Sequence, residues 1–144
     1  MTVRYVNGIR VGAITIDPLE RVDTALWTHR PRRRAPARRV LTSATLARMW
    51  SPALGLPTGT SAIAMGFRIE LLPSGYGPGG VAVLLTRAGA RTLVVGLTTE
   101  ALKPRRAERL VLFAASPTSD AHAWQSEVFS ARGDRRLVVP DGAA

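Results

Sequence analysis

Short apolar runs separated by turn residues constrain the fold of this chain more than any other feature. The clearest run is Phe67–Leu71, where apolar and charged side chains alternate as on a strand with one buried face. Asn7-Gly8 and Ala88-Gly89 are dipeptides typical of tight hairpin turns. Similar runs predict strands near residues 3–6, 9–16, 22–28, 40–41, 62–72, 81–86, 92–95, 110–114 and 137–139. Strands are therefore expected to dominate the first two thirds of the chain.

Two helices are expected between these strands. Thr42 or Ser43 can cap a helix that ends near Trp50, and a second helix is expected over residues 119–131. Strands mixed with helices in this way predict an α/β fold, in which a mostly antiparallel sheet packs against helices.

The length of the chain bounds its domain organisation. A chain of 144 residues suits one domain, expected over residues 1–140, followed by a disordered tail at 141–144. The sequence contains no apolar run of about eighteen residues, so no membrane span is expected. Because there is no cysteine, disulfides and thiolate metal sites are excluded. We therefore expect a cytoplasmic protein.

The chain is strongly basic. Twenty basic residues stand against ten acidic ones, which gives a formal net charge of +10, and Lys103 is the only lysine. Arginine forms planar, bidentate contacts with phosphate and carboxylate groups. This composition favours a polyanionic partner such as nucleic acid. The alternative is a general compositional bias toward arginine, which the many Ala, Gly and Pro residues would fit.

The densest positive charge lies in residues 30–39, directly after the strand expected at residues 22–28. The arginines of this segment repel one another, which favours a contact with phosphates; a solvated loop is the alternative. His29 opens the same segment, and is either a metal-ligand or acid–base position or a histidine packed at a strand end. The tryptophans at positions 27, 50 and 124 are expected in the core rather than as stacking platforms. The residues that we expect to bind the anion are Arg30, Arg32, Arg33, Arg34, Arg38 and Arg39.

Six segments, taken in order, carry a resemblance to a known family. They are the hairpin around Asn7-Gly8 with Ile16-Asp17-Pro18, and the segments 22–29, 39–45, 70–76, 82–96 and 111–124. Their order resembles the N-terminal half of the metallo-β-lactamase fold. The branch that it resembles is the exonuclease and RNA 3′-end-processing type, including the exonucleases associated with DNA ligase. The resemblance implies an α/β metallo-β-lactamase-like sandwich, reduced to about one half of the full αββα fold.

The same resemblance implies that the metal site of the family is lost. Members of the family hold two divalent metals, bridged by a hydroxide, on histidines and aspartates. His29 takes the first ligand position and would be a relic ligand. The other five ligand positions fall on Pro31, Arg33, Arg34, Tyr76 and Leu97. Two of these, Arg33 and Arg34, are cations, which repel a divalent metal.

Together these observations predict a catalytically inactive pseudoenzyme without a cofactor. It would act as a nucleic-acid-binding or subunit-interaction module. One alternative is a metal-dependent hydrolase or exonuclease that acts on nucleic acid through a non-standard site, with zinc as its cofactor. A second alternative is a purely structural subunit of a larger assembly. Half of a sandwich would leave one sheet face uncovered, so a homo-oligomer or a partner subunit is expected.

Overall fold

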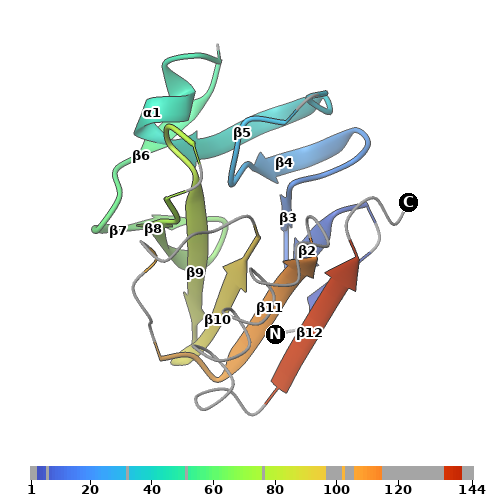
Figure 1. Cartoon of the computed structure of the whole chain (residues 1–144), viewed down its shortest axis with the longest axis vertical. Coiled ribbons are helices and arrows are strands. Elements are labelled where there is room, and N and C mark those ends of the chain that lie inside the picture. The colour runs from blue at the N-terminus through green and yellow to red at the C-terminus, as the bar shows by residue number, and fades with distance from the viewer. Residues whose placement is uncertain are drawn as a thin grey trace.

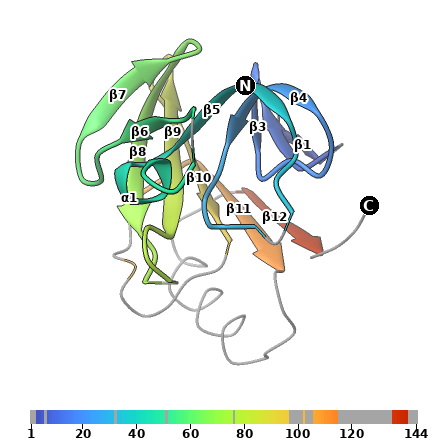
Figure 2. The same cartoon turned by 90° about the horizontal axis from the view of Figure 1, so that it is seen from above.

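The computed structural model of the chain describes residues 3–5, 7–31, 33–50, 52–75, 77–96, 102, 106–114 and 135–140. For residues 5, 112–114 and 135–140 it describes the backbone alone. The described residues form two six-stranded β-sheets and one short helix (Figures 1 and 2). Strands dominate the described residues, which contain a single short helix, so the fold class is mainly β.

The first sheet is built from the N-terminal strands. β1, β2 and β3 pair antiparallel, whereas β3, β4, β5 and β6 pair parallel to one another. The strand bounds are β1 (Val3–Tyr5), β2 (Ile9–Val11), β3 (Ile14–Ile16), β4 (Val22–Leu26), β5 (Ala37–Ser43) and β6 (Leu54–Leu56).

The second sheet contains the remaining strands. β7 to β10 form an antiparallel meander, and β11 and β12 extend it in parallel on the side away from β7 (Figure 1). In both sheets the strand order follows the chain order, which gives a solenoid-like stacking of neighbouring strands. The strand bounds are β7 (Ser61–Ala64), β8 (Phe67–Pro73), β9 (Val81–Arg87), β10 (Ala90–Val95), β11 (Arg109–Ala114) and β12 (Arg135–Pro140).

The two sheets bury one face of each against the other. Because side chains alternate along a strand, every second residue of β2, β3 and β8 points into this common core. Phe67 is the largest core residue of the second sheet and is 1% exposed. The core cluster contains Ile9, Val11, Ile14, Ile16, Leu26, Leu41 and Leu56 from the first sheet, and Phe67, Ile69, Leu71, Val81, Val83, Leu85, Val94 and Val111 from the second.

The opposite face of the first sheet, which we call the outer face, is partly covered by the crossover between β4 and β5. The strand register places Thr15 beside Ala25 and Ala25 beside Val40 on this face. Ala35, from the crossover, is 5% exposed and packs with Ala25 and Trp27 in a small apolar cluster. The crossover is anchored by a hydrogen bond from the Val22 amide to the Pro36 carbonyl, 3.1 Å long. The outer face is therefore apolar at its centre.

The single described helix is far shorter than expected. α1 spans Ala44–Ala47, and the Ser43 hydroxyl caps it by accepting a hydrogen bond from the Leu46 amide. The cap was predicted correctly, but the helix ends after four residues. Pro52 follows closely, and Leu54–Leu56 then pairs with β5 as strand β6. Sheet pairing of this segment prevents a longer helix. The second helix, expected over residues 119–131, lies outside the described residues.

The predicted α/β metallo-β-lactamase-type sandwich is therefore wrong, and so is its assignment as half of an αββα fold. The described chain is almost entirely β, with no layer of helices packed on its sheets. Five of the ten strand pairings are parallel, which also differs from the mostly antiparallel sheet that we expected. The resemblance rested on a succession of hairpins and short strands, and such a succession is common to many β folds.

Individual strands were predicted more accurately than their arrangement. The expected hairpin turns at Asn7-Gly8 and Ala88-Gly89 both separate antiparallel strands. The expected strand at 9–16 is split into β2 and β3, and the expected strand at 62–72 is split into β7 and β8 by a turn at Met65-Gly66. β6 lies outside all of the expected strands.

A clamp between two loops fixes the N-terminal end of the first sheet. The Asn7 carboxamide oxygen accepts hydrogen bonds from the amides of Leu19 and Glu20, and its nitrogen donates to the Glu20 carbonyl. Gly8 lies so close to the same loop that a Cβ there would be 2.7 Å from the carbonyl oxygens of Ile16 and Asp17. The β1–β2 turn thus holds the loop that follows β3.

Within the described part of the chain, no helix combines the length and the apolar character needed to cross a membrane.

We predict that Gly8→Ala destabilises the protein more than Gly66→Ala does. Both glycines have a positive φ, +88° and +81°, so either alanine should lower the free energy of unfolding by about 1–2 kcal/mol. Gly66 has no atom within 4 Å of the added Cβ, whereas Gly8 meets backbone atoms, which should cost a further ~1–3 kcal/mol. Urea unfolding of the two variants measures the difference, and equal stabilities would contradict the clamp.

Candidate functional site

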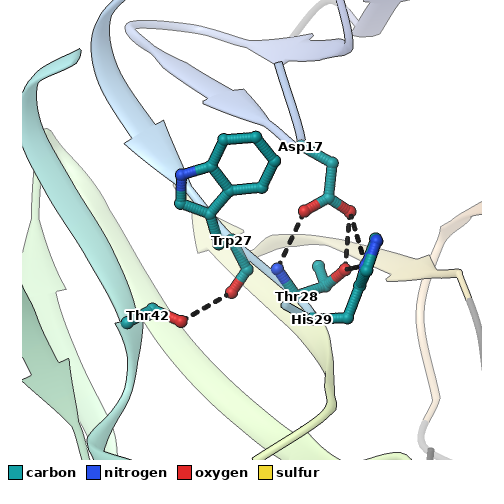
Figure 3. Close-up of polar contacts among 5 residues, drawn as sticks. All are labelled: Asp17, Trp27, Thr28, His29 and Thr42. Carbon is teal, nitrogen blue, oxygen red and sulfur yellow. Dashed lines mark hydrogen bonds and ion pairs between the residues drawn. The ribbon is translucent and has the colours of Figure 1, made fainter. Parts of the chain in front are cut away.

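The ends of two neighbouring parallel strands bring together a carboxylate, a hydroxyl and an imidazole. Asp17 directly follows β3, and Thr28 and His29 follow β4. The Thr28 amide donates to Asp17 Oδ1 at 2.9 Å, and the Thr28 hydroxyl lies 2.5 Å from Asp17 Oδ2. His29 Nδ1 lies 3.0 Å from Thr28 Oγ1 and 3.7 Å from Asp17 Oδ2 (Figure 3). Because parallel strands end at the same edge of a sheet, the pairing of β3 with β4 produces this group.

The hydroxyl of Thr28 links the Asp17 carboxyl to the His29 ring. Thr28 donates its one hydroxyl hydrogen to Asp17 Oδ2. In the His29 tautomer that carries its hydrogen on Nδ1, Thr28 Oγ1 accepts from this nitrogen and Nε2 is the acceptor of the ring. The His29 side chain is 29% exposed, so the group presents an oriented imidazole at the edge of the first sheet.

Asp17 is held in an unfavourable electrostatic environment. Burial raises the pKa of the Asp17 carboxyl above its ordinary value, while the nearby His29 and the hydrogen bonds from Thr28 act in the opposite direction. Its backbone has φ of 49°, in the left-handed region that aspartate tolerates better than most residues. The fold therefore keeps a carboxyl in a strained position where its charge is poorly solvated.

These three residues do not make a metal site of the expected kind. Among the described residues, no group of three or more His, Asp or Glu side chains is placed to hold a metal ion. Pro31, Arg33 and Arg34 are half-buried or exposed in the crossover, and Tyr76 and Leu97 lie outside the described residues. With the fold corrected, the ligand positions taken from the resemblance carry no weight. The geometry instead provides one imidazole, that of His29, next to the Thr28 hydroxyl, which in turn is hydrogen-bonded to the Asp17 carboxyl.

Trp27 and Trp50 close the apolar cluster on the outer face. Trp27 is 2% exposed, and its indole Nε1 is buried with no hydrogen-bond partner in the part of the chain that the structure describes. The Trp27 backbone carbonyl accepts from the Thr42 hydroxyl at 3.0 Å (Figure 3). Trp50 packs edge-on against Trp27 with 6.0 Å between ring centroids, and the Arg34 guanidinium lies 5.6 Å from the Trp50 ring centroid. Trp27 is thus a core residue, as expected, and Trp124 lies outside the described residues.

The predicted anion-binding arginines do not share one surface. Arg30, Arg33 and Arg34 are exposed in the crossover, while Arg32 lies outside the described residues. Arg38 and Arg39 are both exposed on β5, but successive residues of a strand point to opposite faces.

Arg38 and Arg39 accordingly have different neighbours. On the outer face, Arg38 Nη1 lies 3.9 Å from Asp23 Oδ1, an exposed pair that contributes little to stability. On the other face, Arg39 Nη1 lies 3.5 Å from the Met65 sulfur at the margin of the core. Among the described residues, Arg34 and Arg38 are thus the members of the predicted set whose contacts place them on the outer face.

Three arginines that the sequence analysis did not select also lie on the outer face. Arg10 stands between the core residues Ile9 and Val11, and the register places it beside Arg4 and Thr15. Arg21 lines the same hollow as Arg10. The signal that could have found Arg10 is its position within an apolar strand, where it must point away from the core. We call Arg4, Arg10, Arg21, Arg34 and Arg38 the outer arginine face.

A comparison with models of known protein families finds no match for this chain, and a comparison with curated proteins finds no similar sequence.

We predict that Thr28→Val destabilises the protein by about 1–3 kcal/mol, because it leaves a buried carboxyl oxygen of Asp17 without its donor. Valine keeps the volume and branching of threonine, so the change isolates the hydroxyl. Thr60→Val, at an exposed position, is the matched control and should change the free energy of unfolding by less than about 0.5 kcal/mol. If both variants unfold at the wild-type urea midpoint, the Asp17–Thr28 bond does not stabilise the fold.

We further predict that Asp17 makes stability depend on pH. A carboxyl whose pKa is raised by folding binds its proton more tightly in the folded chain. Its stabilising contribution is complete below the unfolded pKa, near 3.8, and is lost as the pH rises through the folded pKa. The free energy of unfolding of wild type minus that of Asp17→Asn should therefore fall with increasing pH across this window. NMR titration of the Asp17 carboxyl carbon gives the midpoint directly, and a midpoint at or below 3.8 contradicts the prediction.

Proposed function

We propose that this protein is a non-catalytic module that binds a polyanion, with nucleic acid as the favoured partner, through the outer arginine face and the adjoining crossover. The observation that carries the proposal is the concentration of exposed arginines on one face of the first sheet. Asp23 is the carboxylate that the register places among them, beside Arg38. Positive charge on this face therefore exceeds negative charge, which is the electrostatic pattern of a phosphate-binding surface.

The construction of the face supports the proposal. Arg4 and Arg10 project from neighbouring strands, about 5 Å apart, and are held by the sheet rather than by a flexible loop. The Arg34 guanidinium, which comes from the crossover, lies over the Trp50 ring. The rigid strand backbone under Arg4 and Arg10 reduces the conformational entropy lost on binding, so more of each phosphate contact contributes to affinity.

The aromatic side chain beside these arginines is a second supporting feature. Trp50 is half-buried, and it packs against Trp27 while Arg34 lies over its ring. Proteins that bind single strands combine cations that contact the backbone with aromatic rings that stack on bases. The juxtaposition of Arg34 and Trp50 favours a single-stranded ligand over a duplex whose bases are already stacked.

The test compares two double variants that remove the same charge from different faces. Arg33→Gln/Arg34→Gln alters the crossover, whereas Arg68→Gln/Arg106→Gln alters exposed arginines elsewhere, Arg68 lying on the face of β8 away from the core. Affinity for a single-stranded oligonucleotide is measured across salt concentrations. The first variant should bind more weakly and lower the slope of log affinity against log salt by about 2, roughly one per phosphate contact. The control should keep the wild-type slope.

Three results would contradict the proposal. Equal losses in both double variants would mean that net charge alone drives binding. No measurable affinity of the wild type at low salt would remove nucleic acid as the partner. Strong binding to a partner protein without any affinity for nucleic acid would instead favour a structural subunit. Circular dichroism of each variant controls for loss of the fold, since Arg34→Gln also removes the contact with Trp50.

A further inference from the structure

A hollow of about 330 Å³ opens on the outer face of the first sheet, and Arg10 and Arg21 of the outer arginine face line it. This volume is at the lower end of the range found for small-molecule sites. Arg10 and Arg21 line it, together with Asp23, Asn7, Thr15 and Thr24. Thr15 is 8% exposed and the register places it beside Arg10 on the outer face, so it belongs to the buried floor of the hollow. The hollow therefore combines two guanidinium groups with one carboxylate over a floor that contains a threonine.

The frame of the hollow is held by hydrogen bonds. Asn7 binds the backbone of Leu19 and Glu20, which fixes the residues directly before Arg21. Arg10 Nε donates to the Gly12 carbonyl at 3.4 Å. The Val22 amide bonds to Pro36 at 3.1 Å, so the wall on the side of β4 is tied to the crossover. A frame that exists before binding does not have to be ordered by the ligand.

The charges in the hollow indicate the chemistry of its ligand. Arginine pairs prefer phosphate or carboxylate, because each guanidinium can give two parallel hydrogen bonds to two oxygens. Asp23 carries the opposite sign and accepts a hydrogen bond from the Thr24 hydroxyl at 3.3 Å. A carboxylate beside two arginines would weaken the binding of a bare anion, but it would accept hydrogen bonds from ligand hydroxyls. A ligand that carries both a phosphate and neighbouring hydroxyls satisfies both kinds of group.

We propose that this hollow is a binding site for a phosphorylated sugar, with Arg10 and Arg21 on the phosphate and Asp23 on a sugar hydroxyl. The ribose phosphate unit of a nucleotide has this chemistry. It can come from a free nucleotide or from one unit of a nucleic-acid strand on the outer arginine face. The site depends on the hollow and its polar lining, not on strand binding, so it can be tested separately from the proposed function.

The first experiment measures the binding of ribose 5-phosphate, ribose and inorganic phosphate to the full chain by NMR. Ribose 5-phosphate should bind at least tenfold more tightly than either of the others and shift the amides of residues that line the hollow. Arg10→Gln/Arg21→Gln should weaken ribose 5-phosphate at least tenfold, whereas Arg68→Gln/Arg106→Gln should leave it unchanged. Equal binding of ribose and ribose 5-phosphate would overturn the proposal, as would shifts confined to residues away from the hollow.

Asp23→Asn provides a second variant with effects in two directions. Removal of the carboxylate should leave the affinity for inorganic phosphate unchanged or raise it, because a repulsive charge is lost. The same change should reduce the advantage of ribose 5-phosphate over inorganic phosphate severalfold, because the acceptor for the sugar hydroxyl is weakened. A parallel change in both affinities would overturn the role of Asp23. The Asp23–Arg38 pair is exposed, so this variant should remain folded.

The source of the sugar phosphate is resolved by competition between adenosine monophosphate and an oligonucleotide. If the oligonucleotide displaces adenosine monophosphate from the hollow, the site binds one nucleotide of a strand. If adenosine monophosphate binds and no oligonucleotide displaces it, the site serves a free nucleotide, and it stands even where the polyanion function fails. If adenosine monophosphate does not bind at a concentration at which ribose 5-phosphate does, the hollow excludes the base and the nucleotide assignment is overturned.

Discussion

Burial of one apolar face of each sheet against the other is the constraint on which the rest of the structure depends. The side chains of β2 and β8 alternate, so the residues that meet in the core leave their neighbours on the outside. On β2 this places Arg10 outside because Ile9 and Val11 are inside, and on β8 it places Arg68 outside because Phe67 and Ile69 are inside. Core packing therefore fixes the outward direction of Arg10, whereas Arg21 and Arg34 of the outer arginine face lie in the connections before and after β4.

Two loops of the first sheet position the polar groups at its edge. The Asn7 carboxamide in the β1–β2 turn binds the loop after β3. The same loop carries Asp17, which directly follows β3 and accepts a hydrogen bond from Thr28 beyond the end of β4. Asp17 is poorly solvated, and its backbone has a positive φ. Thr28 donates a hydrogen bond to the Asp17 carboxyl and also lies within hydrogen-bond distance of His29. The loop after β3 therefore helps to position the N-terminal hairpin, the His29 imidazole and the residues of the hollow. A change in this loop should alter all three.

The sequence allowed the strands to be predicted but not their partners. Alternation at Phe67–Leu71 and the turn at Ala88-Gly89 are local signals, and both strands and turn formed where expected. Ser43 was one of the two caps expected, yet the helix is short because Leu54–Leu56 pairs with β5. Parallel pairing of β3 with β4 places Asp17 beside Thr28, and no local sequence pattern predicts this pairing. The arginines divided between two faces for the same reason, since side-chain direction on β5 is fixed by register.

The order of the strands has a consequence for how the chain acquires its fold. In each sheet the strands that pair are consecutive in the chain, so most pairings close a short stretch of chain, whereas residues 115–134 separate β11 from β12. Assembly can then proceed by successive addition, beginning at a local hairpin such as β9–β10, without waiting for distant segments to meet. Docking of the two sheets then buries one apolar face of each, and it depends on the total apolar area of these faces rather than on any single pair of strands.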